Sequence, residues 1–114
     1  MAATTLVASA ARTTTGSSSA ITVGSGAANL TLEVETTAAS GTSPSMTLTV
    51  QWSVDGTNFG NIDGATDSFA AITATGNVVK SLPVRAPYMQ FTWTISGTSP
   101  SFTFSILDVT SNVI

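Results

Sequence analysis

The fold of this chain is decided by the run Met46-Thr47-Leu48-Thr49-Val50-Gln51-Trp52-Ser53-Val54. Apolar residues alternate with polar ones along it, and several are β-branched residues, which favour strands over helices. Strict alternation is typical of a strand with one face in the core and the other in solvent. The pattern therefore predicts a strand whose even-numbered side chains, from Met46 to Val54, point inward.

Three further runs alternate in the same way. Their apolar residues are Leu30, Leu32 and Val34, then Met89, Phe91, Trp93 and Ile95, and finally Phe102, Phe104 and Ile106. Weaker strands are expected over residues 5–11, 20–23, 68–73 and 77–82, with glycine, aspartate and proline turns between them. Seven or eight short strands predict an all-β fold, a single antiparallel β-sandwich of jelly-roll or immunoglobulin-like type.

An internal repeat lies between these runs. The hexapeptide SGTSPS occupies residues 40–45 and recurs 56 positions later at residues 96–101, each time before an alternating run. Each copy is expected to form the tight loop of a hairpin. The apolar positions before the two copies have opposite parity, which a β-bulge or an altered loop register would absorb. The repeat fits two facing hairpins of a sandwich, which we prefer, or an old duplication.

The two ends of the chain differ from its middle. Residues 2–11 are small and mostly apolar, and residues 13–19 are polar. Residues 1–19 are therefore expected to form an extended N-terminal arm and linker, or an edge strand on a loose tether, before a sandwich domain over 20–114. Neither a targeting segment nor a membrane-spanning run is recognisable, so folding in a cytoplasm is expected.

The composition argues against several classes of function. Cysteine and histidine are absent, which removes disulfides, thiolate metal ligands and the commonest general base. The only basic residues are Arg12, Lys80 and Arg85. Three cations are too few to neutralise a run of phosphates or to bind an anionic membrane surface. Only 8% of the residues are charged, which favours a subunit that packs against others through uncharged surface.

Carboxylates are the remaining candidates for chemistry. Asp55, Asp63 and Asp67 lie close together in the sequence and could bind calcium, but their spacing matches no calcium loop and turn formation explains them better. Glu33 and Glu35 lie on one face of a strand, without the cleft that a glycosidase needs. They fit a solvated face, or ion pairs with Lys80, Arg85 or another subunit. No serine has a recognisable base.

Aromatic residues on the surface could form a platform for binding a sugar. Trp52 and Trp93 fall in phase with the inward-facing positions, so they are predicted to lie in the core. Phe59 and Tyr88 lie near turns and are the only candidates for an exposed platform. We therefore predict no catalytic, metal or cofactor residues, and a protein that is not an enzyme.

Three segments resemble a known class of proteins. Residues 48–59 (LTVQWSVDGTNF), 88–104 (YMQFTWTISGTSPSFTF) and 6–13 (LVASAART) are similar to small structural proteins of tailed bacteriophages, the head decoration or minor capsid proteins. The resemblance implies a structural virion protein on the capsid surface. Its implied partners are the major capsid protein and further copies of itself, as a trimer or dimer. It carries over no functional residues.

The resemblance leaves alternatives open. The chain could be a component of a tail tube or fibre, or a carbohydrate-binding sandwich for host attachment. Apolar or basic residues near the ends are the expected partner contacts: Leu6, Val7, Arg12, Val113 and Ile114. The SGTSPS segments are further candidates for contact with the next copy.

Overall fold

Two long strands organise the fold. The computed structural model describes residues 3–23, 28–64 and 67–109, and its two longest elements are β4 (Asn29–Ser53) and β7 (Tyr88–Val109). They pair antiparallel from Leu32 opposite Asp108 to Ser53 opposite Tyr88. The shorter strands β1 (Ala3–Arg12), β2 (Gly16–Ser17) and β3 (Ile21–Thr22) pair with β7, whereas β5 (Asp67–Ser68) and β6 (Gly76–Pro83) pair with β4. The prediction of an all-β, antiparallel fold is confirmed as one seven-stranded sheet.

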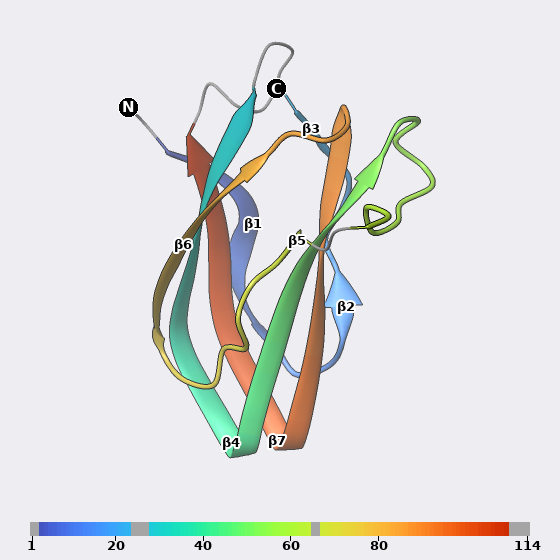
Figure 1. The fold of residues 1–114 in the computed structure, drawn as a ribbon. Helices are drawn as coiled ribbons and strands as arrows, with labels where there is room; N and C mark the ends of the chain where they lie inside the picture. The colour runs from blue at the N-terminus through green and yellow to red at the C-terminus, as the bar shows by residue number, and fades with distance from the viewer. Residues whose placement is uncertain (1–2, 24–27, 65–66, 110–114) are drawn as a thin grey trace.

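Both long strands bend at the SGTSPS repeat (Figure 1). The two copies face each other across the β4–β7 pair, with Ser40 opposite Ser101 and Ser45 opposite Ser96. The expectation that each copy forms a hairpin loop was wrong, because each remains inside its strand. Register shifts within the repeat turn the strands without ending the ladder, as β-bulges do.

Glycine is required at the bend because the two backbones touch. Gly41 and Gly97 have φ values of 114° and 119°. A Cβ atom on Gly41 would lie 2.7 Å from the carbonyl oxygen of Ser99, and one on Gly97 would lie 2.8 Å from that of Ser43. The matched geometry indicates an approximate twofold relation between β4 and β7. It supports the duplication that the repeat had left open.

A β-bulge reconciles the two copies. The register of β4 against β7 shifts between Thr36 and Ala38. Before the shift, even-numbered residues such as Val34 are buried; after it, Ala39 packs against the core. Ala39 precedes its copy of the repeat as Ile95 precedes the other, so the predicted bulge is confirmed.

The bend folds the sheet so that its two halves face each other (Figure 1), and the buried side chains form one core cluster. One half holds β6 and β1 together with the part of β4 before the repeat and the part of β7 after it. The other half holds β5, β2 and β3 together with the part of β4 after the repeat and the part of β7 before it. The rings of Trp93 and Phe104, from opposite halves of β7, meet edge to face at 5.4 Å. The largest fully buried side chains come from both halves: Phe91, Phe102, Phe104, Leu30, Leu32, Met46, Leu48, Met89 and Ile106.

Some expected strand boundaries differ from the structure. Strands β1, β3 and β6 match the expected segments 5–11, 20–23 and 77–82, whereas 68–73 contains only the second residue of β5 and an isolated bridge from Ile72 to Met46. Val54 was expected to point inward, but β4 ends at Ser53 and Val54 is 82% exposed. The chain leaves the sheet there for the loop that begins with Asp55.

The N-terminal residues belong to the sheet. Strand β1 pairs with β7 from Ala3 opposite Val109 to Arg12 opposite Phe102. Of the two alternatives for this segment, the described residues form the edge strand and not a projecting arm. The tract 13–19, expected as a polar linker, contains β2, and Ser18 exchanges hydrogen bonds with the backbone of Phe91.

Candidate functional site

Asp67 is a buried carboxylate with three donors around it. Its side chain is 7% exposed and accepts a hydrogen bond of 2.8 Å from Trp52 Nε1. Arg85 donates to both carboxylate oxygens, from Nε at 2.7 Å and from Nη2 at 3.0 Å. The hydrogen bond from Arg85 holds the pKa of Asp67 below its usual range despite burial, which acts in the opposite direction. This arrangement ties β5 and the segment before β7 to β4.

The interaction of Asp67 excludes it from a calcium site with Asp55. Asp55 instead closes its own loop, accepting hydrogen bonds from the backbone amides of Thr57 and Asn58 at 2.9 Å each. These amide bonds, the one from Asn58 being the stronger influence, lower the pKa of Asp55 far below its usual range. Among the described residues, no three side chains of the metal-binding types come together.

Arg12 was expected to contact a partner but is used inside the chain. Its guanidinium donates to the carbonyl oxygens of Ala8, Ala10 and Phe104 at 3.0–3.1 Å. It also lies 4.4 Å from the centre of the Phe104 ring and 4.9 Å from that of Trp93. The bonds to Ala8 and Ala10 fall beside the register shift between Val7 and Ala10, so Arg12 stabilises β1 where its pairing with β7 is irregular.

The other expected contact residues are divided between core and undescribed positions. Val7 is 5% exposed and belongs to the core, and Leu6 is half-buried against it. Val7 thus has little exposed surface left for contact with a partner. Val113 and Ile114 lie outside the described residues. A shallow hollow of about 330 Å³ beside Leu6 and Arg12, bounded also by Ser17–Ser19 and Trp93, remains at this end of β1.

Glu33 and Glu35 occupy the outer face of β4, as expected, without the proposed ion pairs. Arg85 pairs with Asp67 instead. Burial, with a hydrogen bond and repulsion from Glu35, raises the pKa of Glu33. The two acids lie on an open face beside Val79, with no cleft between them that could hold a substrate.

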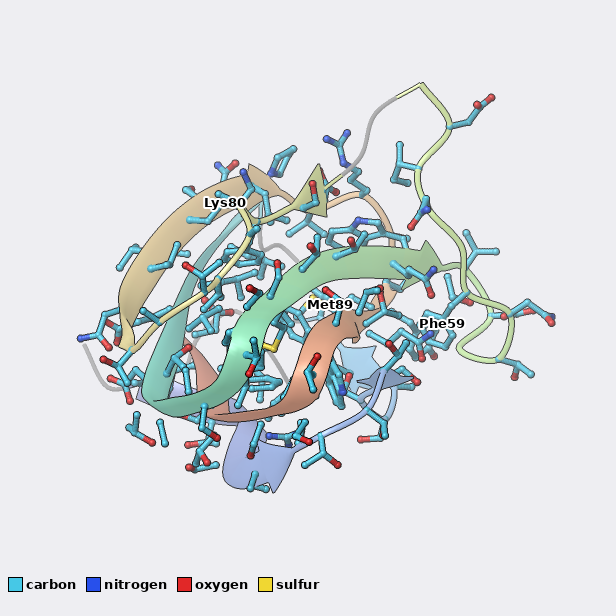
Figure 2. All side chains as sticks on the ribbon, turned by 90° about the horizontal axis from the view of Figure 1, so that it is seen from below. Phe59, Lys80 and Met89 are labelled. Atoms are coloured by element: carbon cyan, nitrogen blue, oxygen red, sulfur yellow. The ribbon has the colours of Figure 1, made fainter. Side chains whose placement is uncertain are left out.

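Both tryptophans lie in the core, as predicted. Trp52 is 4% and Trp93 is 7% exposed. Phe59 and Tyr88 are half-buried, and the Tyr88 ring lies close to Gly56 of the Asp55 loop. In Figure 2, Phe59 lies beside this loop, on the opposite side of the buried Met89 from Lys80. The exposed aromatic area available for stacking on a sugar is therefore small.

The outward-facing features that remain are sheet edges and aliphatic side chains. Large exposed apolar residues among those described are Val54, Val79 and Val78. Val78 and Val79 lie on β6, which pairs with β4 on one side only. In the sequence, neither stands out, because both fit an ordinary half-buried strand. Their exposure follows from the position of β6 at the edge of the sheet (Figure 1).

Comparisons with known proteins give no assignment. Neither a family model nor a curated protein nor a solved structure was found to match the chain. Within residues 3–23, 28–64 and 67–109, no helix has the length and hydrophobicity to cross a bilayer.

Proposed function

We propose that the chain is a structural virion protein, a decoration protein that binds and stabilises the outside of a tailed-phage head. Its partners are the major capsid protein and further copies of itself. The observation that supports this best is how the fold uses its charges: Arg12, Arg85 and Asp67 all bond within the chain. What remains outside is mostly serine, threonine and aliphatic groups with a few scattered charges such as Glu33 and Lys80, and most of such a surface can be desolvated against a neighbour with little electrostatic penalty.

The same use of charge bears on other partners. With Arg12 and Arg85 engaged inside the chain, Lys80 is the one basic side chain left for phosphates. One cation gives negligible affinity for nucleic acid or for an anionic membrane. The proposal therefore includes neither partner, and it includes no catalytic or cofactor site. In it, the folded sheet is a two-layered, sandwich-like support whose outer face meets the shell.

The test is cosedimentation of the purified protein with undecorated heads. Saturable uptake is expected, with a fixed number of copies per head, and decorated heads should take up none because their sites are occupied. Heads that have bound the protein should release their DNA at a higher temperature. Rings or tubes of the protein alone, without uptake by heads, would move the function to the tail. Binding of neither kind, with tryptophan fluorescence that responds to sugars, would favour host attachment.

A further inference from the structure

Strand β6 presents the longest regular free edge in the described sheet. It pairs with β4 over eight residues, from Gly76 opposite Thr36 to Pro83 opposite Asn29, without a register shift. Strand β1, the other long edge, is interrupted by two shifts, which is a common protection against unwanted strand pairing. The remaining short strands have two residues each. An edge of this length without a bulge is a template for another strand.

The direction of the backbone groups along β6 follows from one hydrogen bond. The amide of Val84 donates to the carbonyl oxygen of Ala28 at 2.9 Å, in register with the β6–β4 pairs. Hydrogen-bonded and non-bonded positions alternate along an antiparallel pair. Even-numbered residues of β6 therefore bond to β4, and odd-numbered ones direct their amide and carbonyl groups to the free edge. Pro83, which has no N–H, occupies an outward position as this requires.

We propose that β6 pairs antiparallel with β6 of a second copy, about a twofold axis at Val79. In this register Val79 faces Val79 of the second copy, and Asn77 faces its Ser81. By symmetry Ser81 also faces Asn77 of the second copy, which makes three pairs. All of these residues direct their backbone groups to the free edge, so each pair forms about two hydrogen bonds. A twofold axis makes the contact self-complementary and closes it at a dimer. The result is one sheet that continues across both copies.

The side chains of β6 suit this register. Val79 is 63% exposed and becomes covered by its own counterpart, while Val78, 37% exposed, lies opposite Lys80 of the second copy. Each Lys80 therefore lies diagonally from Lys80 of the second copy, about 7–8 Å away, and not directly opposite it. Glu33 lies opposite Val79 on the neighbouring strand β4. Two β6 strands therefore lie between the two copies of Glu33, which are about three strand spacings, or ~14 Å, apart. That distance exceeds the screening length of about 8 Å at physiological salt.

Charge placed on the axis tests the proposal. Val79→Lys puts two ammonium groups directly opposite each other and should convert a dimer of twice 11.5 kDa into an 11.5 kDa monomer in sedimentation equilibrium. Val54→Lys is the matched control, because Val54 is also exposed but lies outside β6. It should remain dimeric. Salt of about 1 M, which shortens the screening length to ~3 Å, should partly restore the Val79→Lys dimer.

Cysteine cross-linking tests the register, since the chain has no cysteine of its own. Cα atoms of a bonded antiparallel pair lie about 5.5 Å apart, within the range of a disulfide. Val79→Cys should therefore form a covalent dimer under mild oxidation, and Val54→Cys should not. Asn77→Cys should cross-link to Ser81→Cys when the two variants are mixed, but neither should cross-link alone. Circular dichroism would confirm that all four variants are folded.

Several outcomes would overturn the inference. They are a monomeric wild-type protein at about 100 μM, a dimer unaffected by Val79→Lys, cross-linking at Val54 as fast as at Val79, or open-ended polymers. The β6 dimer specifies the self-association that is part of the proposed function and rests on that proposal. The experiments nevertheless distinguish a failure of the dimer from a failure of the decoration role. A monomer that binds heads contradicts only the β6 dimer, whereas a β6 dimer that ignores heads contradicts only the decoration role.

Discussion

Replacing Asp67 with asparagine tests whether the buried carboxylate holds β5 to the rest of the sheet. The change preserves shape but supplies one acceptor oxygen where the carboxylate has two. Because Trp52 and Arg85 both donate to this side chain, the new amide must point its own N–H groups at one of them. A buried donor left without an acceptor costs about 1–3 kcal/mol. The exposure of Arg85 to water limits the contribution of the ion pair.

We therefore expect Asp67→Asn to lower the free energy of unfolding by about 2 kcal/mol, a factor of roughly 30 in the folding equilibrium. For a domain of this size the unfolding temperature should fall by about 8 °C. Urea unfolding followed by tryptophan fluorescence measures the change. Asp63→Asn is the matched control, because it removes the same charge from an exposed loop position. Its effect should stay within about 0.5 kcal/mol.

The pH dependence gives an independent check. The folded-state pKa of Asp67 is lower than its unfolded value, so its stabilisation is present above about pH 4 and is lost as the pH falls through the folded pKa. The difference between the wild type and Asp67→Asn should therefore shrink in acid. Asp55 also titrates there, but both proteins retain it. Equal effects of Asp67→Asn and Asp63→Asn, or a difference that does not change with pH, would refute the reasoning.

The other predictions concern single side chains. Arg12→Lys should lower stability by about 1–2 kcal/mol in thermal unfolding, because an ammonium group cannot reach three carbonyls and stack on two rings; no loss would contradict the assigned role. Gly41→Ala should destabilise by about 2 kcal/mol more than Gly64→Ala, since both have positive φ but only the first Cβ meets Ser99; equal urea midpoints would contradict this. Glu33→Gln should raise the urea midpoint at pH 7, because burial and a neighbouring carboxylate raise the pKa of Glu33. The gain should vanish toward acid, where Glu33 is protonated in the wild type as well, and a gain that persists in acid would argue against that cause.

Local pattern was sufficient for the strands of this fold but insufficient for its bend. The alternation around Leu48 and Phe91 predicted strands correctly, since it depends only on neighbouring residues. Glycine and proline in SGTSPS are typical of loops, and the hairpin interpretation followed from them. The structure keeps both copies in the strands because Gly41 meets the backbone of Ser99, far away in the sequence. No local rule contains that contact.

The candidate site was missed for the same reason. The sequence neighbours of Asp67 indicate a turn residue or a calcium ligand, and those of Arg12 indicate a partner contact. Their partners are Arg85 and Phe104, which only the pairing of β4 with its neighbours and of β1 with β7 brings near. The scarcity of basic residues was the one signal in the sequence that pointed to these contacts. A buried acid needs a cationic partner, and the chain has only three basic residues that could supply it.

The use of these few charges explains why the outer surface can serve assembly. A domain normally keeps its charges outside, where they oppose unintended contact with neighbours. Here Arg12 and Asp67 stabilise the interior, and β6 carries Lys80 as its only charge. The register at Val79 places the two copies of Lys80 diagonally, about 7–8 Å apart, so that neither ammonium group lies directly opposite the other. Because β6 carries a single charge, pairing with another copy of the chain costs less electrostatic repulsion than it would for an edge with several like charges.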